Sequence, residues 1–286
     1  MLDVDTYDRP HSLKDALAIL GDPGIRIIAG CTDVLAATER KVIPGHVLDI
    51  TGIPELRGIA QVPGGLRLGA TTTWSDIIKA NLPPSLRALQ LAGRQVGAVQ
   101  IQNRGTLAGN LCNASPAADG VPPLLILDAE VELASFSGVR RMALSDFLQG
   151  PRQTARTDDE ILTGVFIPEA ALGGTSHFSK LGARDFLVIS IAMVAVRLDV
   201  VDGVIRQAAC SIGSCGPVAT RLGNVENALI GATLPQAVDR IADADVAANL
   251  SPIDDVRADA GYRLKTAAEL LRRTISQSVT SQGAPA

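Results

Sequence analysis

Two short runs of small and polar residues have the composition of loops that bind an anion through their backbone. Residues 27–34 read Ile-Ile-Ala-Gly-Cys-Thr-Asp-Val, and residues 106–119 read Thr-Leu-Ala-Gly-Asn-Leu-Cys-Asn-Ala-Ser-Pro-Ala-Ala-Asp. Both contain glycine with threonine, asparagine or aspartate, the residue types that favour turns and helix starts. Because free N–H groups at such places attract phosphate, the two runs predict a phosphate-binding site.

The first run, called the octad below (residues 27–34), reads as a strand that turns into a helix. We expect the strand to end at Gly30 and Thr32 or Asp33 to cap the next helix. A Cβ at position 30 would hold a phosphate away, which gives a reason for the glycine. Asp33 would repel a phosphate, so capping is its expected role. Taken alone, the octad is also consistent with an ordinary strand-turn-helix junction.

The second loop (residues 106–110) and the residues after it predict a backbone with open N–H groups. Gly109 lets a ligand come close, and the pair Ser115 and Pro116 is typical of a helix start. We expect Cys112 to be a packed small residue without a redox role, since free cysteine is commonly buried.

The chain lacks the better-known signatures of catalysis, of metal binding and of other nucleotide sites. It contains no GxGxxG, GxxxxGK[ST], GxSxG or HExxH pattern. The cysteines have no zinc-type spacing and the histidines are far apart; they are Cys31, Cys112, Cys210, Cys215, His11, His46 and His177. We therefore expect no catalytic residue and no metal ligand in this chain, and histidines with surface or structural roles.

Composition limits the classes of partner. The 286 residues are 47% hydrophobic and 20% charged, with a net charge of −4 and no basic cluster with interleaved aromatics, which disfavours nucleic-acid binding. The first ten residues lack the apolar segment of a signal peptide. The longest apolar run, residues 186–196, is too short for the roughly 20 residues of a membrane span. We expect a cytoplasmic protein without membrane insertion.

Hydrophobic patterning predicts an α+β chain in several parts. Helices at 12–20 and 34–41 alternate with strands at 25–29 and 47–50, an arrangement typical of a parallel crossover. Next come strands at 66–69, 129–134 and 161–167 and helices at 75–80 and 85–92. A glycine-rich boundary follows at 169–174. After it we expect three strands, at 177–181, 187–200 and 204–212, the last two joined by a hairpin at 201–203. Helices are expected next, at 218–230, 234–242 and 259–276. We expect domains at 1–57, 58–172 and 173–280, with a flexible tail at 281–286.

The motifs together resemble the FAD-binding subunit of the xanthine dehydrogenase and carbon monoxide dehydrogenase family of molybdenum hydroxylases. The resemblance rests first on residues 29–33, 106–110 and 114–119, which occur in the family's order. Weaker similarities lie at 150–154 with 159–162, at 178–180 with Arg184, and at 252–257 with Tyr262 and Arg263. The resemblance covers nearly the whole chain.

The resemblance implies a two-subdomain FAD-binding fold of the vanillyl-alcohol-oxidase (PCMH) type. A C-terminal domain would follow, made of a three-stranded antiparallel sheet and a helical bundle. The implied cofactor-binding residues are Ile27, Ile28, Ala29, Gly30, Cys31, Thr32, Asp33, Val34, Thr106, Leu107, Ala108, Gly109, Asn110, Asp119, Leu162 and Lys180. The octad would bind the pyrophosphate and ribityl region, and the second loop would bind phosphate as well.

Individual roles follow from the same resemblance. Asp119 would accept hydrogen bonds from the adenosine ribose, Leu162 would lie along the adenine, and Lys180 would lie at the isoalloxazine, where a cation stabilises the anionic reduced ring. The family commonly has glycine where this chain has Cys31, so that side chain must point away from the pyrophosphate.

The implied function is electron transfer within a larger enzyme. A large subunit would carry the molybdopterin cofactor and substrate site, and a small subunit two [2Fe–2S] clusters, in a dimer of heterotrimers. FAD on this chain would pass electrons to NAD+, oxygen, a quinone or another carrier. Two alternatives stay open: a free-standing flavin oxidoreductase, and a cofactor-free scaffold subunit suggested by Cys31 and Asp33.

Overall fold

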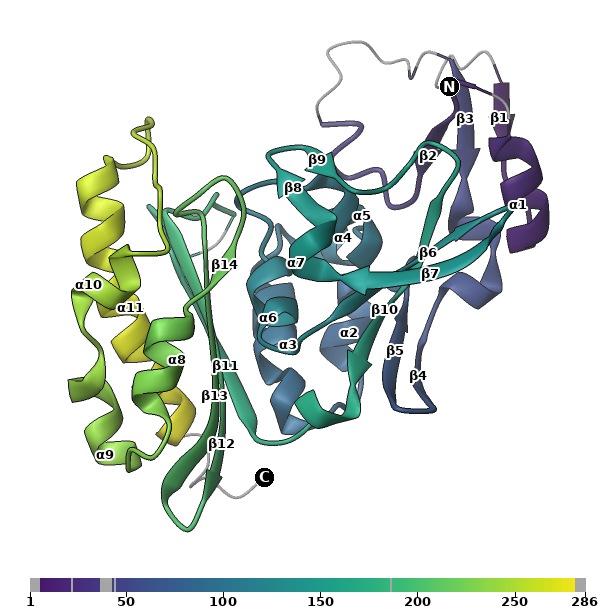
Figure 1. Cartoon of the computed structure of the whole chain (residues 1–286). Helices are drawn as coiled ribbons and strands as arrows, with labels where there is room; N and C mark the ends of the chain where they lie inside the picture. Colours follow the sequence, from purple (N-terminus) through teal and green to yellow (C-terminus); the bar gives the residue numbers. More distant parts are fainter. Residues whose placement is uncertain (1–5, 22, 37–42, 44, 186, 281–286) are drawn as a thin grey trace.

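The structure is a computed structural model that describes all residues except 1–5, 22, 37–42, 44, 186 and 281–286. Three sheets follow one another along the molecule, with the N-terminal sheet at one end and a layer of helices at the other (Figure 1). The predicted flexible tail lies outside the described residues.

The N-terminal sheet has the order β1-β3-β2, and both pairs of strands are parallel. Its strands are β1 (Thr6–Asp8), β2 (Arg26–Ile28) and β3 (His46–Asp49). Helix α1 (Leu13–Leu20) is capped by Ser12 and buries Ala16 and Leu20. The predicted helix at 34–41 is not seen at residues 34–36, which belong to a turn, and its remainder lies outside the described residues.

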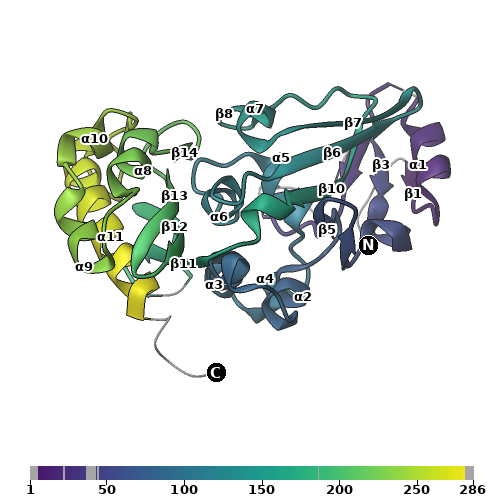
Figure 2. The same cartoon turned by 60° about the horizontal axis from the view of Figure 1, so that its bottom comes forward.

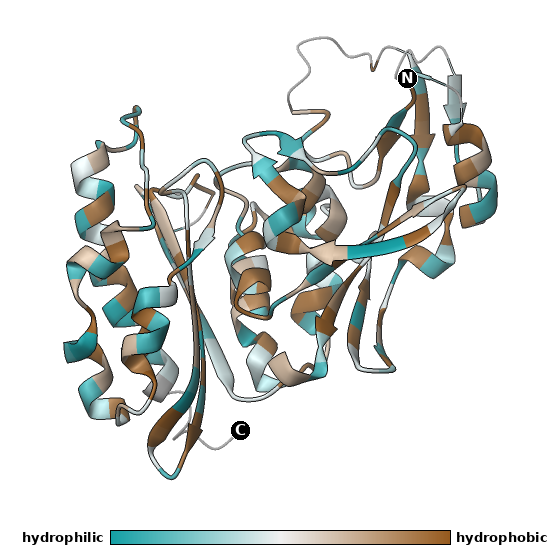
Figure 3. Ribbon diagram, viewed as in Figure 1, coloured by the Kyte–Doolittle hydropathy of each residue, from teal (hydrophilic) through white to brown (hydrophobic). Residues whose placement is uncertain are grey.

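The middle sheet is antiparallel, in the order β4-β5-β10-β6-β7. Its strands are β4 (Ile59–Val62), β5 (Gly65–Gly69), β6 (Glu130–Ser135), β7 (Gly138–Ala143) and β10 (Ile161–Pro168). Leu68, Val131 and Val165 are 0% exposed on one face of this sheet. The alternate positions carry polar groups such as Arg67 and Glu132, whose side chains form an ion pair, as a period of two residues requires. β7 includes a hydrophilic stretch (Figure 3).

Short helices cover the buried face of the middle sheet. They are α2 (Trp74–Lys79), α3 (Arg87–Gln95), α4 (Val99–Gln102), α5 (Leu107–Asn113), α6 (Val121–Leu125) and α7 (Leu144–Phe147). A small hairpin, β8 (Leu148–Gly150) with β9 (Gln153–Thr154), follows α7. Figure 2 shows α3 and α6 between β10 and the C-terminal sheet. The helices thus join the two larger sheets into one layered body.

The C-terminal sheet has four antiparallel strands in chain order, one more than predicted. They are β11 (Thr175–Leu181), β12 (Ala192–Val201), β13 (Val204–Gly213) and β14 (Thr220–Arg221). The predicted hairpin is present: Asp202 and Gly203 both have positive φ, 53° and 76°, as a tight two-residue turn needs. β12 is buried along residues 192–198 because helices lie on both faces of the sheet.

The first two of the three predicted outer helices are shorter than predicted, and a further short helix, α10 (Asp243–Ala247), was not predicted. The outer helices are α8 (Gly223–Leu229), α9 (Leu234–Ala237), α10 and α11 (Ala260–Thr280). The helix expected from 218 begins only at Gly223 because Thr220 and Arg221 pair with β13. Single 3₁₀ turns complete the chain at Ile50–Gly52, Pro54–Leu56, Pro84–Leu86, Glu169–Ala171 and Val238–Arg240.

Candidate functional site

A cavity of about 750 Å³ lies where β2, α5 and the start of β10 meet. Its wall includes three of the predicted site segments: Ile27, Ile28 and Ala29 of the octad, Ala108 and Gly109 of the second loop, and Leu162. Cys112, Arg26, Arg152, Arg156, Asp158 and Asp159 are also part of the lining. Ile27 and Leu162, 135 positions apart in sequence, are thus gathered at one concave site, as expected of a small-molecule site.

Gly30, within the octad, packs directly against Arg104 and Gly105, the segment before the second loop. A Cβ at this position would lie 2.0 Å from the carbonyl oxygen of Arg104 and 3.0 Å from Cα of Gly105. The glycine therefore allows close backbone packing between the two loops. This packing is a second reason for the glycine, and the room that it would leave for a phosphate stays a prediction.

Cys31 has a left-handed backbone, with φ of 59°, a conformation that glycine adopts most easily. Its side chain packs against Ile28, Ile43 and Val47, and Sγ lies 3.5 Å from the carbonyl oxygen of Ala29. Burial raises the pKa of the Cys31 thiol. The thiol is thus turned into the sheet, which removes one reason for reading the octad as part of a cofactor-free scaffold.

The octad offers backbone donors. Among the described residues, the N–H groups of Cys31, Thr32 and Asp33 donate no hydrogen bond. Successive N–H groups around a left-handed residue form the kind of concavity that binds anions. Asp33 accepts a hydrogen bond from Nδ2 of Asn113 at 3.0 Å instead of capping a described helix, so its carboxylate is tied to α5.

The second loop does not offer its N–H groups, contrary to the prediction. Residues 107–113 form α5 with Thr106 as N-cap, and the N–H groups of Leu107 and Ala108 bond to the carbonyl oxygens of Thr72 and Ala70. The N–H of Gly109 bonds to Oγ1 of Thr106 at 3.1 Å. Segment 106–110 therefore borders the cavity as a wall. Whether it contacts a cofactor stays a prediction.

Two further details of residues 111–119 differ from the predictions. Ser115 and Pro116 do not start a helix: Oγ of Ser115 accepts the N–H of Ala117 at 3.2 Å within a turn, and α6 begins at Val121. Cys112 is exposed in the cavity and is not a packed residue. The helix containing it turns that side of its surface toward the ligand space.

Asp119 and Lys180 form a buried ion pair outside the cavity lining. Nζ of Lys180 donates to Oδ2 of Asp119 at 2.8 Å, and Oγ of Ser190 donates to Oδ1 at 3.2 Å. The side chains of Lys180 and Asp119 are 5% and 9% exposed. Burial raises the pKa of the Asp119 carboxyl, against the opposing effect of Lys180 and Ser190. The three groups form one polar cluster, called the Lys180 cluster below (Lys180, Asp119, Ser190).

This geometry changes the roles expected of the pair. A carboxylate and an ammonium 2.8 Å apart cannot bind opposite ends of an extended dinucleotide. Asp119 was predicted to bind the adenosine ribose and Lys180 to lie at the isoalloxazine. These two roles cannot both be correct. Ser190 was not predicted, although it is the single polar residue in the apolar run 186–196, and an isolated hydroxyl in such a run is the signal for a buried hydrogen bond.

Trp74 lies behind both loops and was not predicted as part of the site. Its side chain is buried, with the residue 1% exposed, and its backbone N–H donates to the carbonyl oxygen of Gly105 at 3.1 Å. A Cβ on Gly120 would lie 2.6 Å from its ring. The only tryptophan of the chain thus supports the backbone on which the second loop and Asp119 depend.

The other candidate groups lie elsewhere. His46 pairs with Asp8 at 2.6 Å, and burial lowers the pKa of His177. Tyr7 donates to Asp49 at 2.5 Å, and burial with this hydrogen bond raises the pKa of Tyr7 to about 12. None of these side chains lines the cavity. The described part of the chain contains no group of three or more side chains that could hold a metal ion, and no helix in it is long and apolar enough to cross a membrane.

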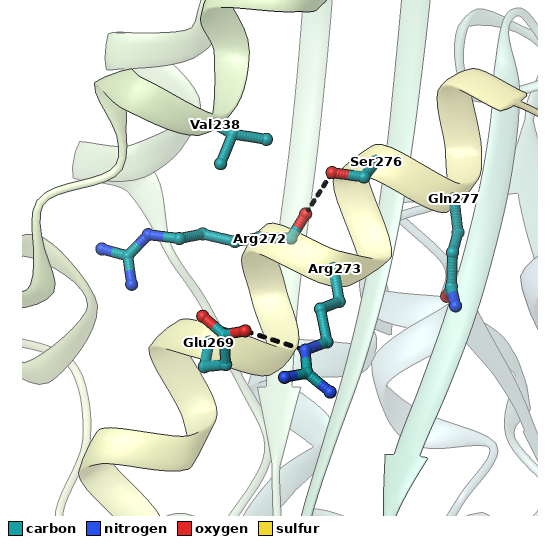
Figure 4. A pocket seen from close by; sticks show the side chains of 6 residues that line it. All are labelled: Val238, Glu269, Arg272, Arg273, Ser276 and Gln277. Atoms are coloured by element: carbon teal, nitrogen blue, oxygen red, sulfur yellow. Dashed lines mark hydrogen bonds and ion pairs between the residues drawn. The ribbon is translucent and has the colours of Figure 1, made fainter.

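A smaller depression of about 360 Å³ lies on α11 (Figure 4). It is lined by Val238, Glu269, Arg272, Arg273, Ser276 and Gln277. Nε of Arg273 bonds to Glu269 at 2.8 Å, and Arg272 bonds to Asp243 and to the carbonyl oxygen of Ile241. Its charged groups are therefore paired with protein, and it contains none of the predicted site residues.

The cavity lining, the octad and the Lys180 cluster, which lies outside that lining, together fit FAD in three respects. The cavity has apolar walls at Ile27, Leu162 and Ala108 for an aromatic base. The octad supplies backbone N–H groups for a pyrophosphate. The Lys180 cluster supplies a buried cation. One chain thus supplies an apolar wall, backbone donors and a cation, the three kinds of group that a flavin dinucleotide requires.

Comparison with known proteins agrees with this fit. Residues 3–170 match the family described as FAD binding domain in molybdopterin dehydrogenase, and residues 177–278 match the CO dehydrogenase flavoprotein C-terminal domain. The chain is 31% identical over 290 residues to the xanthine dehydrogenase FAD-binding subunit of Escherichia coli O157:H7, with 99% of each chain covered. It is 37% identical over 234 residues to the nicotinate dehydrogenase FAD-subunit of Eubacterium barkeri, with 79% of each covered.

The fold has the same relatives among solved structures. A chain of the reconstituted CO dehydrogenase from Oligotropha carboxidovorans superimposes with a TM-score of 0.90 at 28% identity, covering 98% of this chain and 99% of that one. The predicted combination of an FAD-binding fold with an α+β C-terminal domain is confirmed. The chain therefore belongs to the family of FAD-binding subunits of xanthine dehydrogenase-type and carbon monoxide dehydrogenase-type molybdenum hydroxylases.

Proposed function

We propose that this chain holds FAD between the cavity and the Lys180 cluster and carries electrons between a partner's iron–sulfur clusters and an external acceptor. The observation that carries the proposal is the cavity itself, because its wall combines the octad, the second loop and Leu162. Bound at this wall, FAD would supply the redox chemistry, and the chain's residues would hold and orient it.

The proposed orientation follows from where the groups lie. The adenosine end would occupy the cavity against Leu162 and the apolar residues of β2. The pyrophosphate would meet the N–H groups of Cys31, Thr32 and Asp33. The isoalloxazine end would lie at the Lys180 cluster, with Asp119 at this same end.

The chain's own groups would set the properties of the bound cofactor. Lys180 holds a buried positive charge, and a cation beside the pyrimidine part of the ring favours the reduced anion. Asp119 and Ser190 fix the position of that ammonium by hydrogen bonds. Bound FAD supplies the ability to accept electrons one at a time and to release them as a pair.

The partners are proposed from the resemblance and from the names of relatives. Similar proteins include the nicotine 6-hydroxylase medium subunit of Paenarthrobacter nicotinovorans and the carbon monoxide dehydrogenase medium chain of Hydrogenophaga pseudoflava. We propose a large subunit with the molybdopterin cofactor and substrate site, a small subunit with two [2Fe–2S] clusters, and a dimer of heterotrimers. The acceptor would be NAD+, oxygen, a quinone or another carrier, and a cytoplasmic location stays a prediction.

Purification of the chain with its neighbouring subunits tests the proposal. We expect one FAD per chain, identified after extraction, and flavin reduction on adding substrate only when the small subunit is present. A complex that contains molybdenum and iron–sulfur clusters but no flavin would contradict the proposal. Flavin reduction by substrate in the isolated chain would instead favour a free-standing flavin oxidoreductase.

A further inference from the structure

Arg263 is a buried arginine whose contacts reach three separate segments. It lies in the first turn of α11, and its side chain is 3% exposed. Nη1 donates to the carbonyl oxygens of Ile191 at 2.5 Å and Ser214 at 3.0 Å, and Nη2 donates to Oδ1 of Asp255 at 2.7 Å. A planar guanidinium can bond several acceptors at fixed angles, which an ammonium cannot do.

Asp255 holds the guanidinium from the side of the 252–263 segment. Its carboxylate also accepts the N–H groups of Arg257 at 2.8 Å and Ala258 at 3.3 Å. The backbone N–H of Arg257, with the guanidinium groups around the carboxylate, lowers the pKa of Asp255 to about 2. The carboxylate is thus charged and fixed at neutral pH, and it fixes Arg263 in turn.

The first carbonyl that Arg263 binds belongs to Ile191, the residue directly after Ser190 of the Lys180 cluster. The N–H of Ile191 donates to the carbonyl oxygen of Leu181 at 2.8 Å, and residues 181 and 191 directly adjoin Lys180 and Ser190. The guanidinium therefore contacts the segment from which Ser190 reaches Asp119. It also fixes the backbone beside the lysine.

The second carbonyl that Arg263 binds belongs to Ser214, which contacts the loop that contains Asp119. The N–H of Ser214 donates to the carbonyl oxygen of Pro116 at 3.1 Å, three residues before Asp119. One buried side chain of α11 thus touches the supports of all three members of the Lys180 cluster. In the resemblance, Arg263 and the 252–257 run had no role.

We propose that Arg263, held by Asp255, is a positioning residue that sets the placement of the Lys180 cluster and through it the affinity and reduction potential of the flavin. This inference rests on the proposed function, because it concerns the cofactor assigned to that cluster. Arg263 itself lines no part of the cavity, so its effect passes through Ile191 and Ser214.

The test uses the full chain loaded with FAD and measures FAD affinity and the flavin midpoint potential. In Arg263→Gln we expect the dissociation constant of FAD to rise on the order of tenfold. The potential should become more negative, because a displaced Lys180 stabilises the reduced ring less. A tenfold change in preference for the reduced form corresponds to about 30 mV for a two-electron couple.

The matched control is Arg272→Gln on the same helix (Figure 4). Arg272 also bonds a carbonyl oxygen and a carboxylate, those of Ile241 and Asp243, but it has no link to the Lys180 cluster. It should lose stability without a change in potential. Arg263→Lys separates positioning from charge, because lysine keeps the positive charge but lacks the planar guanidinium that bonds several acceptors. We therefore expect the flavin potential of Arg263→Lys to stay shifted.

Three outcomes would overturn the inference. One is an Arg263→Gln potential equal to that of Arg272→Gln, and another is a return to the unmodified value in Arg263→Lys. If Arg263→Gln does not fold, Asp255→Asn carries the test, and an unshifted potential in that variant is the third. A chain that binds no FAD at all refutes the proposed function. If the chain binds FAD and Lys180→Gln shifts the flavin potential, but substitutions of Arg263 and Asp255 do not, only this inference is refuted.

Discussion

Replacement of Gly30 by alanine tests the claim that the two loops of the site are held together by backbone packing. The new Cβ would lie 2.0 Å from the carbonyl oxygen and 2.7 Å from the carbonyl carbon of Arg104, far inside the ordinary contact distance of 3.4 Å. Both neighbours are backbone atoms, so no side chain can rotate away. The octad and residues 104–105 must therefore move apart.

The expected cost follows from overpacking. Inserting a methyl group into packed structure costs about 1–3 kcal/mol, and the backbone contact places this variant at the upper end. In a chain of this size that free energy corresponds to a decrease of about 5 °C or more in Tm. Displaced N–H groups of the octad should also weaken FAD binding about tenfold, or 1.4 kcal/mol.

Two measurements on the same variant check the reasoning. Thermal unfolding without cofactor reports the packing, and quenching of Trp74 fluorescence on titration with FAD reports binding. Gly223→Ala is the control, because a Cβ at Gly223 meets nothing within 4 Å. If Gly30→Ala has normal stability without cofactor but binds FAD weakly, the packing argument is refuted. Gly30 would then be needed only to make room for the phosphate.

Further predictions concern the cavity and the sheet beside it. Leu162→Ala should weaken FAD binding. Its control is Leu133→Ala, at the cross-strand partner of Leu162 outside the cavity, which should lower the free energy of unfolding by about 2–5 kcal/mol without changing FAD affinity. Equal FAD affinities of the two variants in equilibrium dialysis would exclude Leu162 from the site. Desolvation at the cavity wall raises the pKa of the Cys112 thiol to about 11, so a thiol reagent should label the free chain at alkaline pH, where the thiolate forms. FAD should protect Cys112 from this labelling, as measured by mass spectrometry, and protection lacking at saturating FAD would place the cofactor elsewhere. Hydrogen bonding from Arg140 lowers the pKa of Glu160 to about 2 from 4.5, so its contribution to stability is complete above pH 4.5 and is lost as the pH falls toward 2. Glu160→Gln should therefore remove part of the acid sensitivity in urea titrations, and an unchanged pH dependence would contradict that assignment.

Features with a local sequence signal were predicted well. The apolar patterns at 66–69, 129–134 and 161–167 predict β5, β6 and β10. In β10 every residue from 161 to 167 is buried, so both faces of that strand are covered and not one alone. The Val201-Asp-Gly203 signal predicts the hairpin because two residues with positive φ suffice for the turn. The approach of the octad and Leu162 to a common site came from the resemblance, and Figure 1 shows their elements meeting at β2, α5 and β10.

Features that depend on distant contacts could not be read from the sequence. The N–H groups at the start of α5 are used by carbonyl oxygens of Ala70 and Thr72, so a loop that looks open is closed by another segment. The pairing of Asp119 with Lys180 joins residues 61 positions apart. The strand at Thr220–Arg221 has two residues, too few for any periodic signal.

A structure of the full chain with bound FAD would test the central claim most directly. The account predicts density for the adenine in the cavity against Leu162, the pyrophosphate at the N–H groups of Cys31, Thr32 and Asp33, and the isoalloxazine ring beside Lys180. An isoalloxazine ring against Leu162, or a pyrophosphate bound away from the octad, would contradict it.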